Sequence, residues 1–429
     1  MEKTELKKLV FEQIDQNKDQ YIKYLESLSR IPAFIYETTH AQELVKTTMS
    51  DMGLELDVFP CTVDDAKDLD DFHAFPRNYE FAPNVENVVG VKKGSKGGKS
   101  LMLIAHVDTE APNKLTPDTS VTIKDGKMSG LGVADSKAGV AMMLLGAEAV
   151  LKNQPELAGD LTLLSSIGKR GAIGTLTAMQ RGYSADLGVY LHPAETGHGF
   201  HEIKNYSMGM LDFHIQVKGK SGKLFDELDY SEVNAIDQGM KVVAALRKWD
   251  SARQSKHRLA ANGLEPQSYT KIDLFTAQSS DFYMCDALCF DITGRVNFGY
   301  DETVQSVFEE MKLFLLDYFK DDPWLSKHPP LIEKGVMKGN PAYVPPETEV
   351  VKLVERVITD VKQFDDFIYQ YHGSSEVRLP NNYGHTPTVG IGPNCGGLGT
   401  RDQIEWVDLE DYIAGIKIAA GLIIDWCCE

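Results

Sequence analysis

The chain has 429 residues, which exceeds the usual size of a domain with a single hydrophobic core. We therefore expect two folded domains. Hydrophobic residues make up 42% of the chain and charged residues 25%, a balance that excludes general disorder. The formal net charge of −19 argues against nucleic acid and anionic membranes as partners, because both are themselves anionic.

We expect neither a signal peptide nor a membrane span. The stretch MEKTELKKLVFEQI is polar with a helical period, and no run of about 18 apolar residues occurs in the sequence. The six cysteines form no CxxC pair, a pattern typical of reduced thiols rather than of a disulfide framework. These features predict a cytoplasmic protein.

Helices and strands alternate along the first half of the chain. Apolar residues recur at helical spacing over residues 3–30, where Pro32 ends the run, and a second helix is expected over 41–53. A hairpin is expected over 121–130, turning at Asp125-Gly126. The other elements expected in this half are strands at 54–60, 84–94, 100–108, 160–168 and 187–193 and helices at 138–153 and 171–182. This alternation predicts an α/β fold with a mainly parallel sheet sandwiched by helices.

The middle of the chain has a different order of elements. They are a strand at 210–219, a helix at 230–249, strands at 271–278 and 288–298, and a helix at 302–319. This order predicts an inserted α+β, ferredoxin-like domain with an antiparallel sheet. A helix at 350–361, a strand at 386–393 and a helix at 409–426 follow the stretch DDPWLSKHPP. We therefore expect a discontinuous first domain, 1–204 and 323–429, and an insert, 205–322.

Polar residues stand where three apolar strands of the first domain end, at His106, at 168–170 and at His192. Ligands of parallel sheets gather at the carboxyl ends of strands, so we expect one shared site. His106 can offer a ring nitrogen to a metal, and Asp108 can orient that ring. Asp135 lies in the glycine-flanked loop GLGVADSKAG. Taken singly, these residues are better explained by a strand end without a metal and by a helix cap.

Together, the stretches LIAHVDTEAP and GLGVADSKAG resemble the metallo-aminoacylase superfamily. This superfamily includes acetylornithine deacetylase, succinyl-diaminopimelate desuccinylase and glutamate carboxypeptidase. The resemblance covers nearly the whole chain, and its later part is most similar to acetylornithine-deacetylase-like members. It extends through the motifs GKSGK, DDPWLSKHPP, GSSEVR, IGP and EWVDLEDY. The resemblance implies a zinc-exopeptidase-like domain with an inserted lid and dimerisation domain, and hence a homodimer.

Relatives of this kind usually hold two metal ions, and the resemblance implies that His106 and Asp135 are ligands, with Asp135 bridging. The family then has a Glu–Glu pair that supplies the general base and a ligand of the second metal. Lys169 and Arg170 stand at those two positions here. The chain therefore departs from the pattern at the second metal and at the base.

Two further ligand positions also differ. The family has an acid before a proline, where this chain has His192, with Glu195 shortly after. The last family ligand is a histidine, and its position holds Arg401. Arginine stays protonated and cannot ligate a metal, so Arg170 and Arg401 disfavour a second ion. We expect one divalent ion (Zn, Mn, Co or Fe), held by His106, Asp135 and either His192 or Glu195.

The general base is open among Lys169, Asp108, Glu195 and Glu110, and Lys169 is equally well explained as a salt-bridge partner. Arg378 matches the family arginine that grips a substrate carboxylate, a task for which the guanidinium geometry is well suited. With Arg170 and Arg401 it would hold a small anionic substrate.

The sequence thus predicts a metal-dependent hydrolase of a C–N bond, either a deacylase or an aminohydrolase, acting on a small carboxylate-bearing substrate. The alternative is a lyase, an isomerase or a small-molecule binding protein derived from the same fold. Loss of the family base favours this alternative, whereas retention of the expected metal ligands opposes it.

Overall fold

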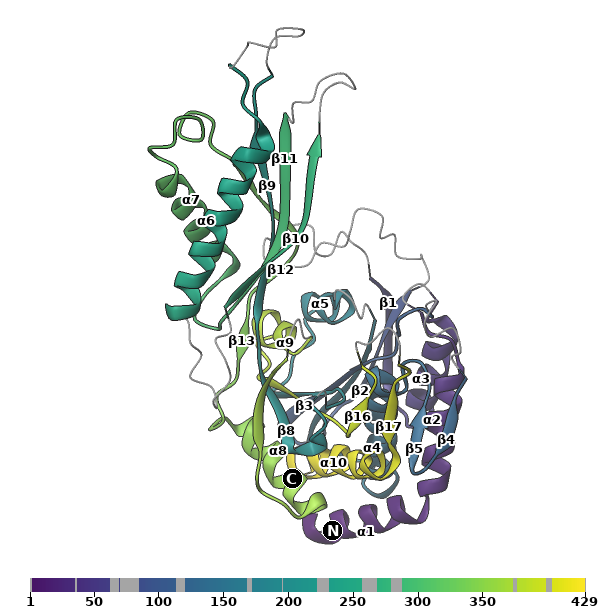
Figure 1. Cartoon of the computed structure of the whole chain (residues 1–429). Helices are drawn as coiled ribbons and strands as arrows, with labels where there is room; N and C mark the ends of the chain where they lie inside the picture. The colour runs from purple at the N-terminus through teal and green to yellow at the C-terminus, as the bar shows by residue number, and fades with distance from the viewer. Residues whose placement is uncertain are drawn as a thin grey trace. The chain divides into compact units, whose positions relative to one another are not determined.

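A computed structural model gives the structure of the chain. It describes residues 2–34, 37–61, 69, 85–112, 120–167, 172–194, 196–221, 231–256, 268–278, 288–372, 376–398 and 403–428. The chain divides into two compact units. The first unit lies within 1–206 and 343–429, and most of the second unit lies within 207–342 (Figure 1).

The first unit is built on a large mixed sheet. Its strands follow the order β1-β2-β6-β3-β7-β15-β8-β13, with β14 paired to β8. The strands are β1 Glu55–Pro60, β2 Glu86–Lys92, β3 Gly98–His106, β6 Gly159–Ser166, β7 Leu187–Leu191, β8 Glu202–Ser207, β13 Ala342–Tyr343, β14 Ile368–His372 and β15 Thr388–Ile391. The central strands β6, β3, β7 and β15 pair in parallel, which confirms the predicted α/β class with a largely parallel sheet.

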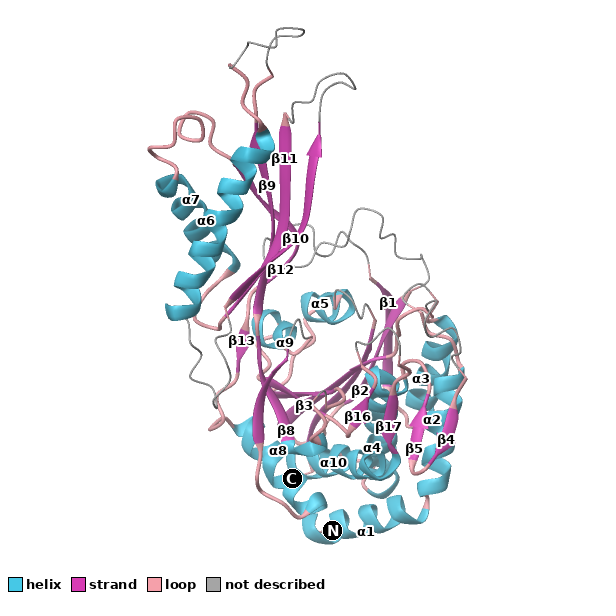
Figure 2. Cartoon of the chain, viewed as in Figure 1, coloured by secondary structure: helices cyan, strands magenta, loops and turns pink. Residues whose placement is uncertain are grey.

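Helices cover both faces of this sheet. Figure 2 shows α5 and α9 on one face and α4, α8 and α10 on the other. The helical segments of the first unit are α1 Lys3–Gln16, α2 Lys18–Arg30, α3 Thr39–Asp51, η2 Val133–Ala138, α4 Gly139–Asn153, α5 Ile173–Gln180, η3 Gly199–His201, α8 Glu349–Lys362, α9 Arg378–Tyr383 and α10 Leu409–Cys427. Helix α4 is buried along nearly its whole length because it packs on the sheet and is also in contact with α10, α1 and α2.

One predicted local element has the expected form and another differs from it. The hairpin at Asp125-Gly126 is confirmed: β4 Thr122–Lys124 and β5 Lys127–Ser129 pair antiparallel, and both turn residues have positive φ. The helical run over 3–30 forms two helices, α1 and α2, rather than one. The break is at Asn17, whose backbone N–H and side-chain amide both bond back to the end of α1.

A second, small sheet of the first unit has the strand order β16-β17-β5-β4. Its other strands are β16 Cys395–Gly396 and β17 Trp406–Asp408. Because β17 pairs with β5, this sheet joins the C-terminal part of the chain to the segment that leads into η2.

The second unit has the β-α-β-β-α-β order of ferredoxin-like domains. Its elements are β9 Gly209–Lys218, α6 Ala235–Lys256, β10 Tyr269–Gln278, β11 Cys289–Phe298, α7 Val304–Tyr318 and β12 Leu331–Gly339. The four strands form an antiparallel sheet with the order β10-β11-β9-β12. Alternate residues of β9 and β11 are buried beneath α6 and α7, which gives this unit a core of its own.

Strand β12 was not among the elements expected from the sequence. It pairs with β9, so the second unit continues to Ala342, past the expected end of the insert at residue 322. Its register shifts between Lys334 and Lys338, and this irregularity weakens the alternation that would have marked a strand.

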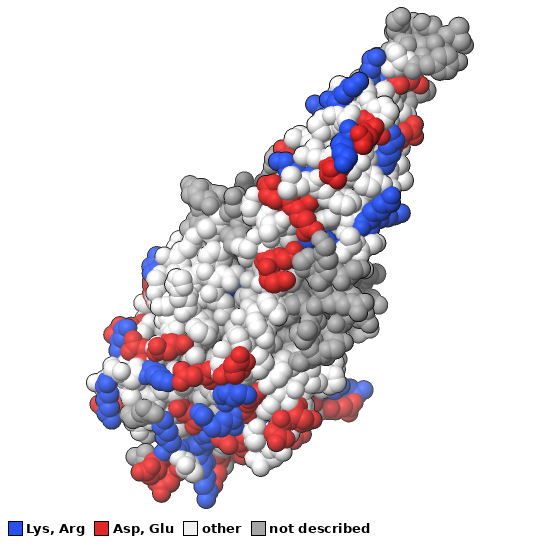
Figure 3. All heavy atoms as spheres, turned by 90° about the vertical axis from the view of Figure 1, so that its left-hand side faces the viewer, with Lys and Arg blue, Asp and Glu red and all other residues white. Residues whose placement is uncertain are grey.

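The described part of the chain contains no helix that is both long and apolar enough to cross a membrane. On the face drawn in Figure 3, acidic and basic side chains are interspersed. The excess of acidic residues is thus partly offset locally by neighbouring cations on that face.

A buried arginine connects the helices of the second unit. Arg253 of α6 is 0% exposed and donates hydrogen bonds to Glu302, Glu310 and Ser268. Removing one member of a buried ion-pair network leaves the others with uncompensated charge, which typically costs about 3–5 kcal/mol. The network is therefore expected to determine much of this unit's stability.

We predict that Arg253→Ala lowers the free energy of unfolding of the second unit by about 3 kcal/mol. Arg247→Ala is the matched control, because Arg247 lies on the exposed face of the same helix. Denaturant unfolding of the full chain measures both, and equal small effects of the two changes would contradict the assigned role of Arg253.

Candidate metal centre

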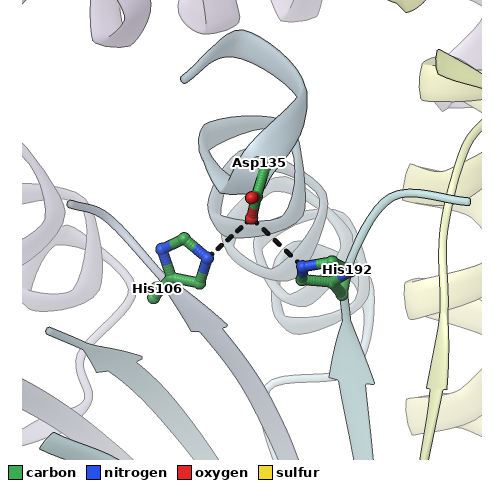
Figure 4. Close-up of side chains that lie close together, drawn as sticks. All are labelled: His106, Asp135 and His192. Carbon is green, nitrogen blue, oxygen red and sulfur yellow. Dashed lines mark hydrogen bonds and ion pairs between the residues drawn. The ribbon is translucent and has the colours of Figure 1, made fainter. Parts of the chain in front are cut away.

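Three side chains of the first unit converge at the carboxyl end of its sheet (Figure 4). His106 is the last residue of β3, and His192 directly follows β7, the parallel neighbour of β3. Asp135 comes from η2 and points between them, with Oδ1 lying 2.8 Å from His106 Nε2 and 3.1 Å from His192 Nε2. Their potential ligand atoms all lie within 4.8 Å of one another.

The backbone around Asp135 is held by a carboxylate that lies far away in the sequence but close in space. Glu405, immediately before β17, accepts hydrogen bonds from the N–H groups of Gly132, Ala134 and Asp135 at 2.9, 3.2 and 3.0 Å. Glu405 is 7% exposed, so these donors compensate a charge that is largely removed from water. The pairing of β17 with β5 carries this carboxylate to the loop.

The other end of η2 is tied to the sheet. Ser136 Oγ donates to the carbonyl of Leu191, the last residue of β7, at 3.0 Å. Gly139, the first residue of α4, approaches the same carbonyl so closely that a Cβ would lie 2.0 Å from its oxygen. Asp135 is therefore held between the small sheet and the end of β7.

The ring of His106 is oriented from its other nitrogen. Nδ1 lies 3.0 Å from the backbone oxygen of Asp108 and 3.4 Å from its carboxylate. Burial acts to lower the pKa of His106, but the hydrogen bonds and charges of Asp108 and Asp135 outweigh it and raise that pKa to about 10. Asp108 thus lies on the side of the ring that faces away from Asp135, where a carboxylate orients a ligand histidine.

His192 has different surroundings. Its Nδ1 lies 2.9 Å from Nζ of the buried Lys204 and 3.2 Å from the carbonyl oxygen of Pro193. The ring of Tyr190 stacks on it with a centroid distance of 5.2 Å, and the Tyr190 hydroxyl donates to Glu376 at 3.0 Å. Burial, and next the charge of Glu376, raise the pKa of Tyr190 well above its usual value.

The structure brings together only part of the predicted site. Arg378, the predicted carboxylate-binding residue, begins α9 and is 1% exposed. The remaining predicted residues, Lys169, Arg170, Glu195 and Arg401, lie outside the described residues. Their roles as base, third ligand or anion-binding groups stay predictions.

Two residues next to the cluster did not emerge as functional from the sequence. Glu405 served only as a landmark in the EWVDLEDY motif, since its partners lie about 270 residues away along the chain. Lys204 lies in the strand EIKNYS, whose polar letters suggest exposure although every residue of it is buried. No local pattern in the sequence would have identified either role.

The donor set suits a divalent transition metal. One imidazole with an oriented far nitrogen, a partly buried carboxylate and a further nitrogen or oxygen match the ligand preferences of zinc and its neighbours. Within the described ranges this is the one cluster of three such side chains. The described residues therefore offer ligands for one ion at this place.

Comparisons with known proteins match most of the chain. Residues 102–425 match the domain of peptidase family M20/M25/M40. The N-formyl-4-amino-5-aminomethyl-2-methylpyrimidine deformylase of Halalkalibacterium halodurans is 26% identical over 345 residues, 75% of this chain and 73% of its own length. The succinyl-diaminopimelate desuccinylase of Thioalkalivibrio sulfidiphilus is 24% identical over 349 residues, 78% of this chain and 85% of its own.

Solved structures share the fold at lower identity. Aminopeptidase PepT from Bacillus cereus superposes with a TM-score of 0.71 at 17% identity, covering 95% of this chain and 98% of that chain. The YXEP protein of Bacillus subtilis, described as a dinuclear metal binding peptidase, gives a TM-score of 0.61 at 13% identity, covering 96% and 98%.

We predict that Glu405→Ala weakens metal binding roughly tenfold to hundredfold, because the loop that carries Asp135 loses its acceptor while every ligand remains. Titration calorimetry with Zn²⁺ or Mn²⁺ measures the affinity, and circular dichroism checks the fold. Glu410→Ala, at an exposed position of the adjoining α10, is the control and should bind as the wild type does. Unchanged affinity in Glu405→Ala would show that the loop keeps its position without this carboxylate.

Proposed function

Since the chain belongs to peptidase family M20/M25/M40, we propose that it is a deacylase or aminohydrolase that cleaves a C–N bond in a small carboxylate-bearing substrate with one divalent ion. The relatives named deformylase and desuccinylase support a reaction at amide bonds other than standard peptide bonds. The single observation that carries the proposal is the cluster of His106, Asp135 and His192 at the strand ends.

His106 and Asp135 would hold the ion, with a third donor from His192 or Glu195. The ion, when bound, supplies a Lewis acid and lowers the pKa of a bound water. Asp108 keeps the His106 ring turned toward Asp135, and Glu405 keeps the Asp135 backbone in place. In this proposal Lys169 or Glu195 takes the proton that the family's glutamate would take.

A single ion is proposed because the sequence carries arginine at two positions where the family has ligands of the second ion, Arg170 and Arg401. Two unit charges of like sign about 4 Å apart repel by about 4 kcal/mol at an effective dielectric constant near 20. A divalent ion beside two guanidinium groups would face at least that repulsion. The arginines would instead attract an anionic substrate.

The substrate class follows from the same cations. Arg170, Arg378 and Arg401 are proposed to bind the carboxylate of the substrate, as the family resemblance implies. We further propose a cytoplasmic homodimer joined through the second unit. The second candidate function, a lyase, isomerase or small-molecule binding protein, is favoured by the replacement of the family's Glu–Glu pair by Lys169 and Arg170.

We predict that the purified protein binds one divalent ion per chain. His106→Ala and Asp135→Ala should each reduce metal content and activity by about a hundredfold, because each removes a proposed ligand. His40→Ala, at an exposed position of α3, should leave both unchanged. Elemental analysis that finds two ions per chain, both required for turnover, would exclude the mononuclear proposal.

We also predict a preference for N-formyl, N-acetyl or N-succinyl compounds that carry a free carboxylate. Their kcat/KM should exceed that of the matched carboxamides by about tenfold or more, because the carboxylate gains charge-assisted hydrogen bonds from arginine. Turnover of both substrate series at equal rates would contradict the proposed substrate class. Stoichiometric metal without turnover of any acyl or aryl amine would favour the second candidate function.

A further inference from the structure

In both histidines of the cluster, Nε2 faces Asp135 and Nδ1 faces another group. That other group differs between the two residues. From this difference we infer that His192 donates a hydrogen bond to Asp135 instead of ligating the metal, and that Lys204 holds it in that role. The inference rests on the proposed metal function and specifies which side chains the ion would take.

His106 has the environment of a ligand. Its Nδ1 faces the carbonyl oxygen of Asp108 at 3.0 Å and the Asp108 carboxylate at 3.4 Å, and both are acceptors. The Nδ1 hydrogen is therefore engaged there. The lone pair of Nε2 is left for an ion beside Asp135, which is the usual arrangement of a metal-binding histidine.

His192 has the opposite environment. Its Nδ1 lies 2.9 Å from Lys204 Nζ, and a lysine ammonium only donates. Lys204 is 2% exposed, so its three hydrogens must find acceptors within the protein. When Nδ1 accepts one of them, the hydrogen of the neutral ring lies on Nε2, which faces Asp135 Oδ1 at 3.1 Å.

The carbonyl oxygen of Pro193 offers an alternative acceptor for a hydrogen on Nδ1, at 3.2 Å. However, Lys204 Nζ already donates to this carbonyl at shorter range. If His192 donated to it as well, two donor nitrogens would face each other at 2.9 Å with no acceptor between them. The hydrogen bonds among Lys204, His192 and Pro193 can form together only when Nδ1 of His192 accepts a hydrogen from Lys204.

The ring of His192 is also held against reorientation. Tyr190 stacks on it with an interplanar angle of 24°, and the Tyr190 hydroxyl is anchored to the buried Glu376. A ring fixed on its face by Tyr190 and on its edge by Lys204 keeps Nε2 toward Asp135. His192 therefore acts as a positioning residue for that carboxylate, and Lys204 as the group that selects its tautomer.

The test uses the tag-free full chain loaded with one equivalent of Cu²⁺, in which pulsed electron paramagnetic resonance counts coordinated imidazoles. We expect one in the wild type, from His106, and two in Lys204→Met, where Nδ1 is released to donate to Pro193 and Nε2 can bind. Lys204→Met should also bind Zn²⁺ about tenfold more tightly, because a fixed like charge is removed. Two imidazoles in the wild type, or weaker metal binding by Lys204→Met, would overturn the inference.

Matched controls separate this effect from a general loss of charge. Lys7→Met makes the same change at a partly buried lysine that pairs with Asp360 and Asp425, and it should keep one imidazole and wild-type affinity. Asp135→Ala should abolish the copper signal, which assigns that signal to this cluster. Should Lys204→Met fail to fold, the imidazole count of the wild type decides the question alone.

Nitrogen NMR of the metal-free protein distinguishes this inference from the proposed function. We expect His192 to carry its hydrogen on Nε2, with Nδ1 unprotonated and accepting. That tautomer together with no metal binding would refute the proposed function while supporting the role of Lys204. A hydrogen on Nδ1 of His192 would overturn the role of Lys204 even in a protein that binds metal.

Discussion

One buried carboxylate joins the parts of the first unit that are far apart in the sequence. Glu405 accepts three backbone hydrogen bonds from the loop at Asp135, and its own backbone oxygen accepts from Gly130. A charge so little exposed is stable only where such donors surround it, so the loop and the carboxylate fix each other. The geometry of the candidate metal centre depends on this pairing because Asp135 is the residue that both histidines face.

The parallel sheet supplies the rest of the geometry. Strands β3 and β7 are paired neighbours; β3 is buried from Leu101 to His106 and β7 is buried throughout. Apolar packing thus determines where His106 and His192 lie, and Ser136 ties the loop of Asp135 to the end of β7. The two strand ends and the glycine-flanked loop are each weak signals in the sequence. They form one site because strand pairing and the Ser136 hydrogen bond hold them together.

The sequence could predict the histidines and the carboxylate because each belongs to a local pattern, a buried strand end or a glycine-flanked loop. It could not predict Glu405 and Lys204, the residues that hold those side chains in place. Glu405 acts through pairing of β17 with β5, a contact that no local pattern encodes. Lys204 lies in a strand whose letters do not reveal its burial, and its effect depends on meeting His192 across the fold. The convergence of these three side chains was therefore within reach of sequence reasoning, while the charged groups around them were not.

That balance bears on the kind of hydrolase this chain is. The resemblance implies an acid where His192 stands, and a neutral ring there removes one negative charge from the centre. The buried ammonium of Lys204 adds a positive charge next to that ring, and arginines stand at two further positions where the resemblance implies ligands. In the proposed mononuclear site, each change would make a second cation less stable and a bound anion more stable. The proposal is therefore one of an enzyme in which fixed protein cations take over the charge of a second ion.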